Sequence, residues 1–94
     1  MQTVTARDVA ALLGRAGAAH GVYEERELGG VYDQQWPRWY ADYLVGHGLG
    51  DLVGMALSVE QVADWLIACD TAYKAERPPV GWAEYYAGRT SLLS

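Results

Sequence analysis

The sequence predicts an all-α protein, folded as a compact bundle of four main helices and one short helix. Three observations favour this class. Apolar residues recur at spacings of three and four in several segments, which is the period of an amphipathic helix. Glycines and prolines separate these segments. No segment convincingly alternates apolar and polar residues as a half-buried strand would.

The first helix is predicted over residues 6–27. Thr5 precedes it and Asp8 follows three residues later, so a hydroxyl can cap a backbone N–H while a carboxylate meets the positive end of the helix. The positions that then share one face are Val9, Leu12, Leu13, Ala16, Ala19, His20 and Tyr23. This pattern fades at Gly29 and Gly30, where the helix should already have ended.

The second predicted helix is strongly aromatic. It follows Asp33, and Pro37 lies near its start, where a missing N–H is tolerated. Its face carries Trp36, Trp39, Tyr40, Tyr43, Leu44 and His47. A short helix is expected next, from a stripe of Leu49, Leu52, Val53, Ala56 and Leu57. Gly46 and Gly48 precede this stripe, Gly50 and Gly54 interrupt it, and their backbone entropy opposes helix formation.

A third long helix is predicted from Ser58 to Glu76. Ser58 and Gln61 form a capping box, in which each side chain accepts a hydrogen bond from the other residue's backbone N–H. Pro78 and Pro79 stop this helix because neither residue can donate a backbone hydrogen bond. A final helix opens with Trp82, Tyr85, Tyr86 and Arg89.

Residues 1–94 are expected to form a single helical domain. A chain of this length buries only about 60 to 65% of the surface that its unfolded form exposes, which suffices for one modest core. The expected core positions include Leu12, Leu13, Ala16, Leu44, Leu52, Leu66 and Cys69. Cys69 is the only cysteine, so no intrachain disulfide can form, and a reducing cytoplasm is the expected location.

An internal duplication is one interpretation of the two halves, residues 5–44 and 58–93. Aligning residues 5–23 with 58–76 superposes the caps and the apolar stripes, and it pairs His20 with Tyr73. The segment Trp36-x-x-Trp39-Tyr40-Ala41 likewise matches Trp82-x-x-Tyr85-Tyr86-Ala87. Chance similarity between two alanine-rich amphipathic helices is the alternative explanation. A true duplication would make the domain a pseudo-symmetric pair of helical hairpins.

Charge and hydropathy patterning exclude two classes of partner. Seven basic residues stand against twelve acidic ones, the net charge is −5, and no run of Lys or Arg occurs. Such a chain has no electrostatic footprint for nucleic acid or for an anionic membrane surface. The longest weakly polar stretch, residues 44–60, contains charged residues and glycines and is too polar to span a bilayer. The start of the chain also lacks the pattern of a signal peptide.

His20 and Glu24 are the candidate catalytic residues. They lie four positions apart, so a helix places both side chains on one face, where they could form an acid–base pair or contribute to a metal site. Metal binding would need a third ligand, from Asp33 or His47, and no established metal motif is present, so we predict no metal and no cofactor. A partly buried His20 held by Glu24 or by a tyrosine hydroxyl is the structural alternative.

All eleven aromatic residues are Trp or Tyr, and each brings an N–H or O–H that needs a partner when buried. Several of them could line a pocket for a planar ligand. The candidate ligand-binding residues are Tyr23, Asp33, Trp36, Trp39, Tyr40, Tyr85 and Tyr86. A packed seam between helices and an exposed anchor for another chain are the alternatives.

Two functions are compatible with these features. The first is a small interaction or assembly module, binding a protein partner or forming a homo-oligomer through aromatic helix faces, with Trp39 as an exposed anchor. The second is a small-molecule-binding protein or minor enzyme, with an aromatic pocket and His20 and Glu24 as its polar groups. The sequence contains no recognisable nucleophile with its base, which favours the interaction module.

Overall fold

The computed structural model describes residues 3–93 and confirms the all-α class. Five α-helices and one 3₁₀-helix occur in this range: α1 (Thr3–Glu27), α2 (Trp36–Gly46), α3 (Leu49–Val53), α4 (Val59–Glu76), α5 (Trp82–Ala87) and η1 (Thr90–Leu93). Three of the α-helices are long. The predicted final helix is divided into the short α5 and the 3₁₀ segment η1.

α1 begins at Thr3, two residues before the cap predicted at Thr5. Neither Thr3 nor Val4 is a strong helix breaker, so the helix extends past the predicted cap and Thr5 lies within it. At the other end α1 stops at Glu27 as predicted. Gly29 and Gly30 follow with φ of 61° and 83°, a backbone conformation that glycine adopts at little cost and that turns the chain toward α2.

α2 starts without a side-chain cap on its own N-cap residue, Gln35. Instead the carboxylate of Asp33 accepts a 2.9 Å hydrogen bond from the Gln35 backbone N–H, and Pro37 occupies the first turn. The short helix α3 is shorter than its apolar stripe. It ends at Val53 because Gly54 takes the left-handed conformation with φ of 74°, which leaves Ala56 and Leu57 outside the helix.

The capping box of α4 is present as predicted. The Gln61 backbone N–H donates to the Ser58 hydroxyl over 3.1 Å, and the Ser58 backbone N–H donates to the Gln61 side chain over 2.9 Å. The helix ends at Glu76, and Arg77 then adopts φ of 47° ahead of the two prolines. Local residues therefore predicted both the start and the end of α4.

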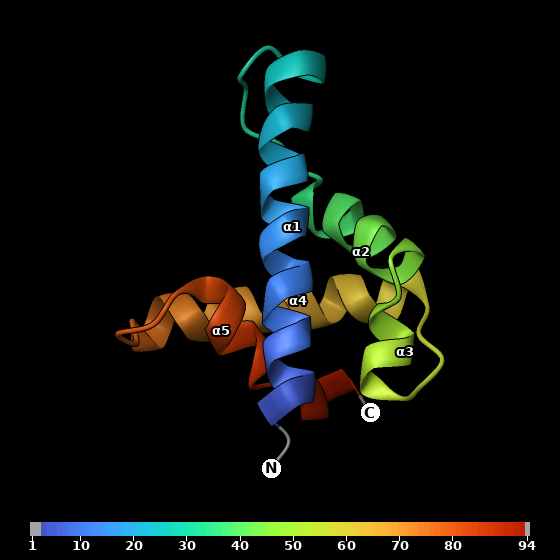
Figure 1. Ribbon diagram of the computed structural model, residues 1–94. Coiled ribbons are helices and arrows are strands. Elements are labelled where there is room, and N and C mark those ends of the chain that lie inside the picture. The colour runs from blue at the N-terminus through green and yellow to red at the C-terminus, as the bar shows by residue number, and fades with distance from the viewer. Residues whose placement is uncertain (1–2, 94) are drawn as a thin grey trace.

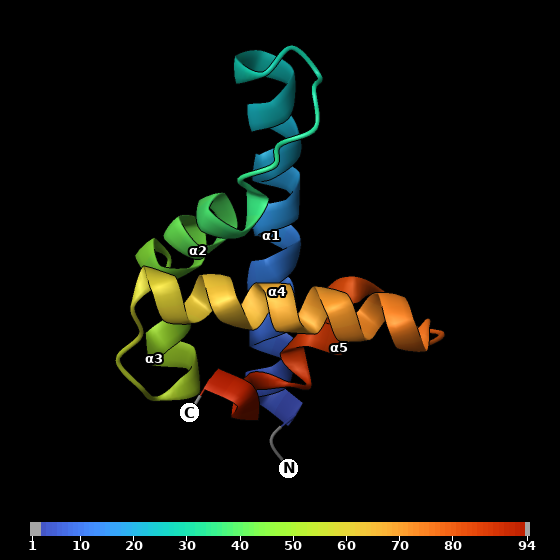
Figure 2. The same ribbon diagram turned by 180° about the vertical axis from the view of Figure 1, so that it is seen from behind.

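The helices cross rather than run parallel. Figures 1 and 2 show α4 running across α1, with α2 and α3 toward one end of α4 and α5 toward the other. The closest packing is between α2 and α4 and between α1 and α5. The last turns of α1 and the chain that follows them extend beyond the other helices in both views. No described helix is long and apolar enough to cross a membrane.

Every described helix contributes to the core, and α1 and α4 contribute the most residues. Of the predicted core positions, the fully buried ones are Leu12, Leu13, Ala16, Leu44, Leu66 and Cys69. Leu52 is only partly buried and packs against this core, because α3 is short and lies at its margin. Trp65 is an additional buried member, and its indole N–H donates to the Arg89 carbonyl over 3.0 Å.

Candidate functional site

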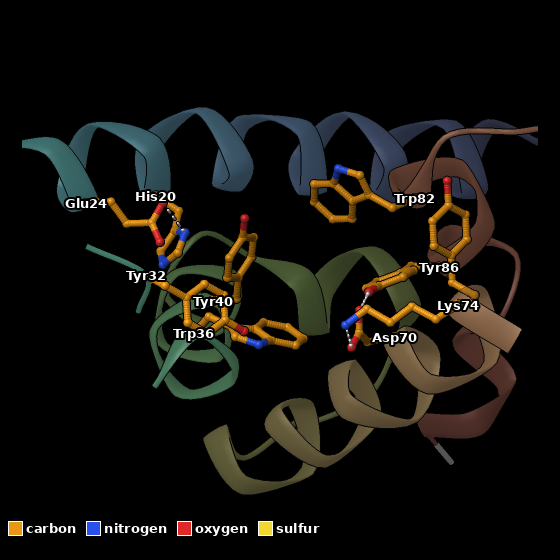
Figure 3. A pocket seen from close by; sticks show the side chains of 10 residues that line it. His20, Glu24, Tyr32, Trp36, Tyr40, Asp70, Lys74, Trp82 and Tyr86 are labelled. Atoms are coloured by element: carbon orange, nitrogen blue, oxygen red, sulfur yellow. Dashed lines mark hydrogen bonds and ion pairs between the residues drawn. The ribbon is translucent and has the colours of Figure 1, made fainter. Parts of the chain in front are cut away.

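A cleft of about 460 Å³ opens between α1, α2, α4 and α5, and we call it the aromatic cleft (Figure 3). The side chains on α1, on the following loop and on α2 are His20, Glu24, Tyr32, Trp36 and Tyr40. The side chains on α4 and α5 are Asp70, Tyr73, Lys74, Trp82 and Tyr86. Its volume falls in the range of small-molecule sites, and six of its ten residues are aromatic.

One end of the cleft holds a buried histidine–carboxylate pair. His20 is 6% exposed and Asp33 is 7% exposed, and His20 Nε2 lies 2.9 Å from Asp33 Oδ2. An ionised carboxylate only accepts hydrogen bonds, so the histidine donates from Nε2. Asp33 thereby fixes the imidazole orientation and leaves Nδ1 on the other side of the ring.

Glu24 faces the second nitrogen of the same imidazole. Its Oε1 lies 3.9 Å from His20 Nδ1, one helical turn along α1. Its Oε2 accepts a 3.2 Å hydrogen bond from the Asp33 backbone N–H. The two carboxylates and the histidine therefore form one network, and this network ties the chain before α2 to the end of α1.

Aromatic rings enclose His20 on its remaining sides. The centroid of its imidazole lies 4.9 Å from Trp39, 4.8 Å from Tyr40 and 6.0 Å from Tyr23. Of these rings only Tyr40 also lines the cleft. The histidine thus connects the cleft to a second aromatic cluster behind it.

The cleft walls are rings set nearly perpendicular to one another. Trp36 and Tyr40 make an interplanar angle of 90° at 5.8 Å, and Tyr40 and Trp82 make 86° at 6.0 Å. Trp82 and Tyr86 follow with 71° at 5.3 Å. Gly17 allows the Trp82 ring to approach α1, since a Cβ at this glycine would lie 3.0 Å from Trp82 Cζ2.

The opposite end of the cleft carries an ion pair. Asp70 Oδ2 lies 3.1 Å from Lys74 Nζ, and Asp70 Oδ1 accepts a long, 3.4 Å hydrogen bond from the Tyr86 hydroxyl. Figure 3 shows this group well separated from His20 and Glu24, with Trp36 and Tyr40 between them. The cleft therefore has two polar ends and an aromatic middle.

The hydroxyls of Tyr40 and Tyr86 remain protonated and uncharged at neutral pH. Burial, with a further contribution from the charge of Glu24, raises the pKa of Tyr40 above its ordinary value. Burial also raises the pKa of Tyr86, and the charge of nearby Asp70 adds to the shift. The Tyr40 hydroxyl can therefore serve as a neutral hydrogen-bond donor to a bound molecule, whereas the Tyr86 hydroxyl donates to Asp70.

The structure brings together some of the predicted site residues and separates others. The candidates that line the cleft are His20, Glu24, Trp36, Tyr40 and Tyr86. Asp33 lies behind His20 as its hydrogen-bond partner. Tyr23 and Trp39 contact His20 outside the cleft, and Tyr85 contacts Tyr73 and Arg89 instead. Trp39 is half-buried among other rings, so it is not the exposed anchor that we expected.

Sequence reasoning did not select Tyr32, Asp70, Tyr73 or Lys74 as site residues, although all four line the cleft. Tyr73 was marked only by its alignment with His20. Asp70 and Lys74 are four apart on α4, like His20 and Glu24 on α1, and this spacing was the one available signal. For Tyr32 no local pattern distinguishes it from other loop residues.

Two further chemistries receive no support from the described side chains. Among residues 3–93, no group of three or more His, Cys, Asp or Glu side chains is arranged to hold a metal ion. Cys69 is fully buried, and burial raises the pKa of its thiol to about 11, so it is a poor nucleophile at neutral pH.

Comparison of this chain with protein-family models, with curated proteins and with solved structures gives no match.

Proposed function

We propose that this protein binds a small organic molecule in the aromatic cleft. The observation that supports this most directly is the lining of the cleft. Six Trp and Tyr residues surround a solvent-open cleft of about 460 Å³, with polar side chains at its two ends. Apolar walls with a few convergent polar groups are typical of ligand sites.

The polar network at the His20 end supports a binding role for that end. Asp33 holds the imidazole through the 2.9 Å hydrogen bond before any ligand arrives, and Glu24 lies 3.9 Å from its other nitrogen. A pre-organised polar group costs little reorganisation when a ligand binds, which improves affinity. We assign His20 and Asp33 positioning roles, because their hydrogen bond fixes this end of the cleft.

The test is a ligand screen on the intact chain with two matched variants. Native mass spectrometry of protein purified without an affinity tag would first detect any retained molecule, as extra mass that is lost on denaturation. Tyr40→Leu and Tyr43→Leu then remove the same kind of ring from α2, but only Tyr40 lines the cleft. We expect Tyr40→Leu to abolish retention or binding and Tyr43→Leu to preserve it. Equal binding by both variants contradicts the proposed site.

Self-assembly is a second candidate function, favoured by exposed apolar side chains at one end of the molecule. Val22, Val31 and Tyr32 are 50%, 65% and 67% exposed, on the last turns of α1 and on the loop after it. Exposed large apolar side chains are available to an interface. The occupant that we propose is a second copy of the chain, meeting the same end by two-fold symmetry.

Sedimentation velocity tests this second candidate. The acidic residues Glu24, Glu25 and Glu27 lie in the same end of α1, so two copies meeting there would repel one another at low salt. We expect a dimer that strengthens with added salt and is lost in Val31→Asp. A monomer at every protein and salt concentration would contradict self-assembly and leave the ligand-binding proposal intact.

A further inference from the structure

The charges around the aromatic cleft are mostly negative. Glu24 and Asp70 contribute carboxylates at its two ends, and Asp33 adds a third behind His20. Lys74 is the one Lys or Arg among the lining residues, and its ammonium is already paired with Asp70 at 3.1 Å. Because the Lys74 side chain is 73% exposed, solvent screens its charge more than that of Glu24, whose side chain is 29% exposed. An anionic ligand would meet net repulsion here.

Trp and Tyr rings line the cleft between these carboxylates. Aromatic rings carry a quadrupole with negative faces and positive edges, so such a lining attracts a cation. Trp36 and Trp82 each meet Tyr40 edge to face, at 90° and 86°, and all three rings line the cleft. Figure 3 shows these three rings between the Glu24 end and the Asp70 end of the cleft.

No Lys or Arg side chain lies over these rings in the part of the chain that the structure describes. The cation–π contact there is elsewhere, with the Arg89 guanidinium 4.6 Å from the centre of the Tyr85 ring. Raised pKa values keep the phenols of Tyr40 and Tyr86 neutral. The middle of the cleft is therefore lined by uncharged Trp and Tyr rings, with a carboxylate at each end.

We infer that the ligand of the aromatic cleft is a small organic cation carrying a methylated ammonium group, which lies against the rings of Trp36, Tyr40 and Trp82 and between the carboxylates of Glu24 and Asp70. This inference rests on the ligand-binding function proposed above. A primary ammonium would direct its three N–H donors to the carboxylates at the ends of the cleft and gain little from the rings between them. A quaternary ammonium has no such donors and is attracted by ring faces and by nearby negative charge.

The experiment compares two probes of the same shape and different charge. Choline is titrated against its carbon isostere, in which a tert-butyl group replaces trimethylammonium, and benzyl alcohol and benzoate serve as unrelated neutral and anionic probes. The readout is the indole N–H signal of each tryptophan in NMR spectra. Trp36 and Trp82 report on the cleft, and Trp65 is the internal control because its N–H is bonded to the Arg89 carbonyl outside it.

We expect choline to shift the Trp36 and Trp82 signals and to bind about tenfold more tightly than its isostere. Glu24→Gln keeps an acceptor for the Asp33 N–H and removes the charge, so it should weaken choline binding and leave the isostere unaffected. Glu25→Gln removes the same charge from an exposed neighbour on α1 and should change neither affinity.

Three results would overturn the inference, and they differ in what they imply for the proposed function. Equal binding of choline and its isostere, or tighter binding of benzoate, refutes the cationic class while confirming a ligand site. Equal weakening of choline binding by Glu24→Gln and Glu25→Gln refutes the assigned position of the ammonium. A cleft that responds to none of the four probes, judged by Trp36 and Trp82, counts against the inference and the proposed function together.

Discussion

Replacing Asp33 tests whether the buried histidine–carboxylate network holds the cleft in shape. Asp33→Ala removes the acceptor of the 2.9 Å hydrogen bond from His20 and the acceptor of the Gln35 N–H. Leaving a buried donor unsatisfied costs about 1 to 3 kcal/mol. Losing the bond at the start of α2 costs about 1 kcal/mol more, by analogy with a helix cap. We therefore expect Asp33→Ala to lower the free energy of unfolding by about 2 to 4 kcal/mol.

Such a loss is large for this protein. A domain of 94 residues typically has a free energy of unfolding of about 5 to 14 kcal/mol. Urea denaturation followed by tryptophan fluorescence measures the change, provided that the transition is two-state. Asp42→Ala is the matched control, because this aspartate is exposed on α2 and its ion pair with Arg38 is long, at 3.9 Å. Its effect should stay below about 0.5 kcal/mol.

Asp33→Asn separates charge from hydrogen bonding. The asparagine amide oxygen can still accept from the Gln35 N–H, and its NH₂ can donate to His20 Nε2. This requires the hydrogen to move to Nδ1, which then faces Glu24. We expect about 1 kcal/mol of destabilisation and a change of histidine tautomer visible in the ring nitrogen shifts. An Asp33→Ala variant as stable as Asp42→Ala would refute the structural role of the network.

Four further changes have defined outcomes. The Cys69 thiol has a pKa of about 11 against an ordinary value of 9.0, so at pH 8 its thiolate fraction is about 100-fold lower, and a thiol reagent should modify it rapidly only after unfolding in urea. Ser58→Ala removes one side of the capping box and should cost about 1 kcal/mol in a thermal or urea melt. A hydrogen bond from Tyr85 lowers the pKa of Glu76. The stability that this carboxylate adds is therefore present above pH 4.5 and is lost as the pH falls through its lower folded-state pKa. The free energy of unfolding of Glu76→Gln should be below that of the parent chain at neutral pH and equal to it in acid. Lys74→Met removes the cation that competes for the Asp70 carboxylate, so choline should bind severalfold more tightly, and weaker binding would argue for an anionic ligand.

Local chemistry in the sequence was enough to predict the helices. The Ser58 capping box, the two prolines after α4 and the three- and four-residue spacing of Val9, Leu12 and Leu13 act within one or two turns of the chain. The errors also have local causes. The apolar stripe continues to Leu57, but Gly54 adopts the left-handed conformation and ends α3 early. Periodicity reports which face is apolar, and it does not report where a glycine will turn the backbone.

The site was less predictable because it depends on how helices cross. The pairing of His20 with Glu24 is an i, i+4 relation, whereas its stronger contact, with Asp33, spans thirteen residues and requires the loop to fold back. Trp39 was expected at the surface, yet it packs between Tyr23 and Tyr43. Spacing places a ring on a helix face, and only the crossing angle decides whether that face meets solvent, another ring or a cleft.

An internal duplication of residues 5–44 and 58–93 would give a physical reason for the position of the cleft. The aligned rings Trp36 and Trp82, like Tyr40 and Tyr86, lie on its walls, so corresponding parts of the two halves would meet there. Each half also ties its long helix to the segment that follows: His20 bonds to Asp33, and the aligned Tyr73 donates to the Val80 carbonyl over 2.8 Å. The polar ends of the cleft do not match in this way. Gly17 aligns with Asp70, and Gly21 aligns with Lys74, so the ion pair of the second half corresponds to two glycines in the first. A ligand held between two such different ends is bound in one orientation, which a symmetric aromatic frame alone would not enforce.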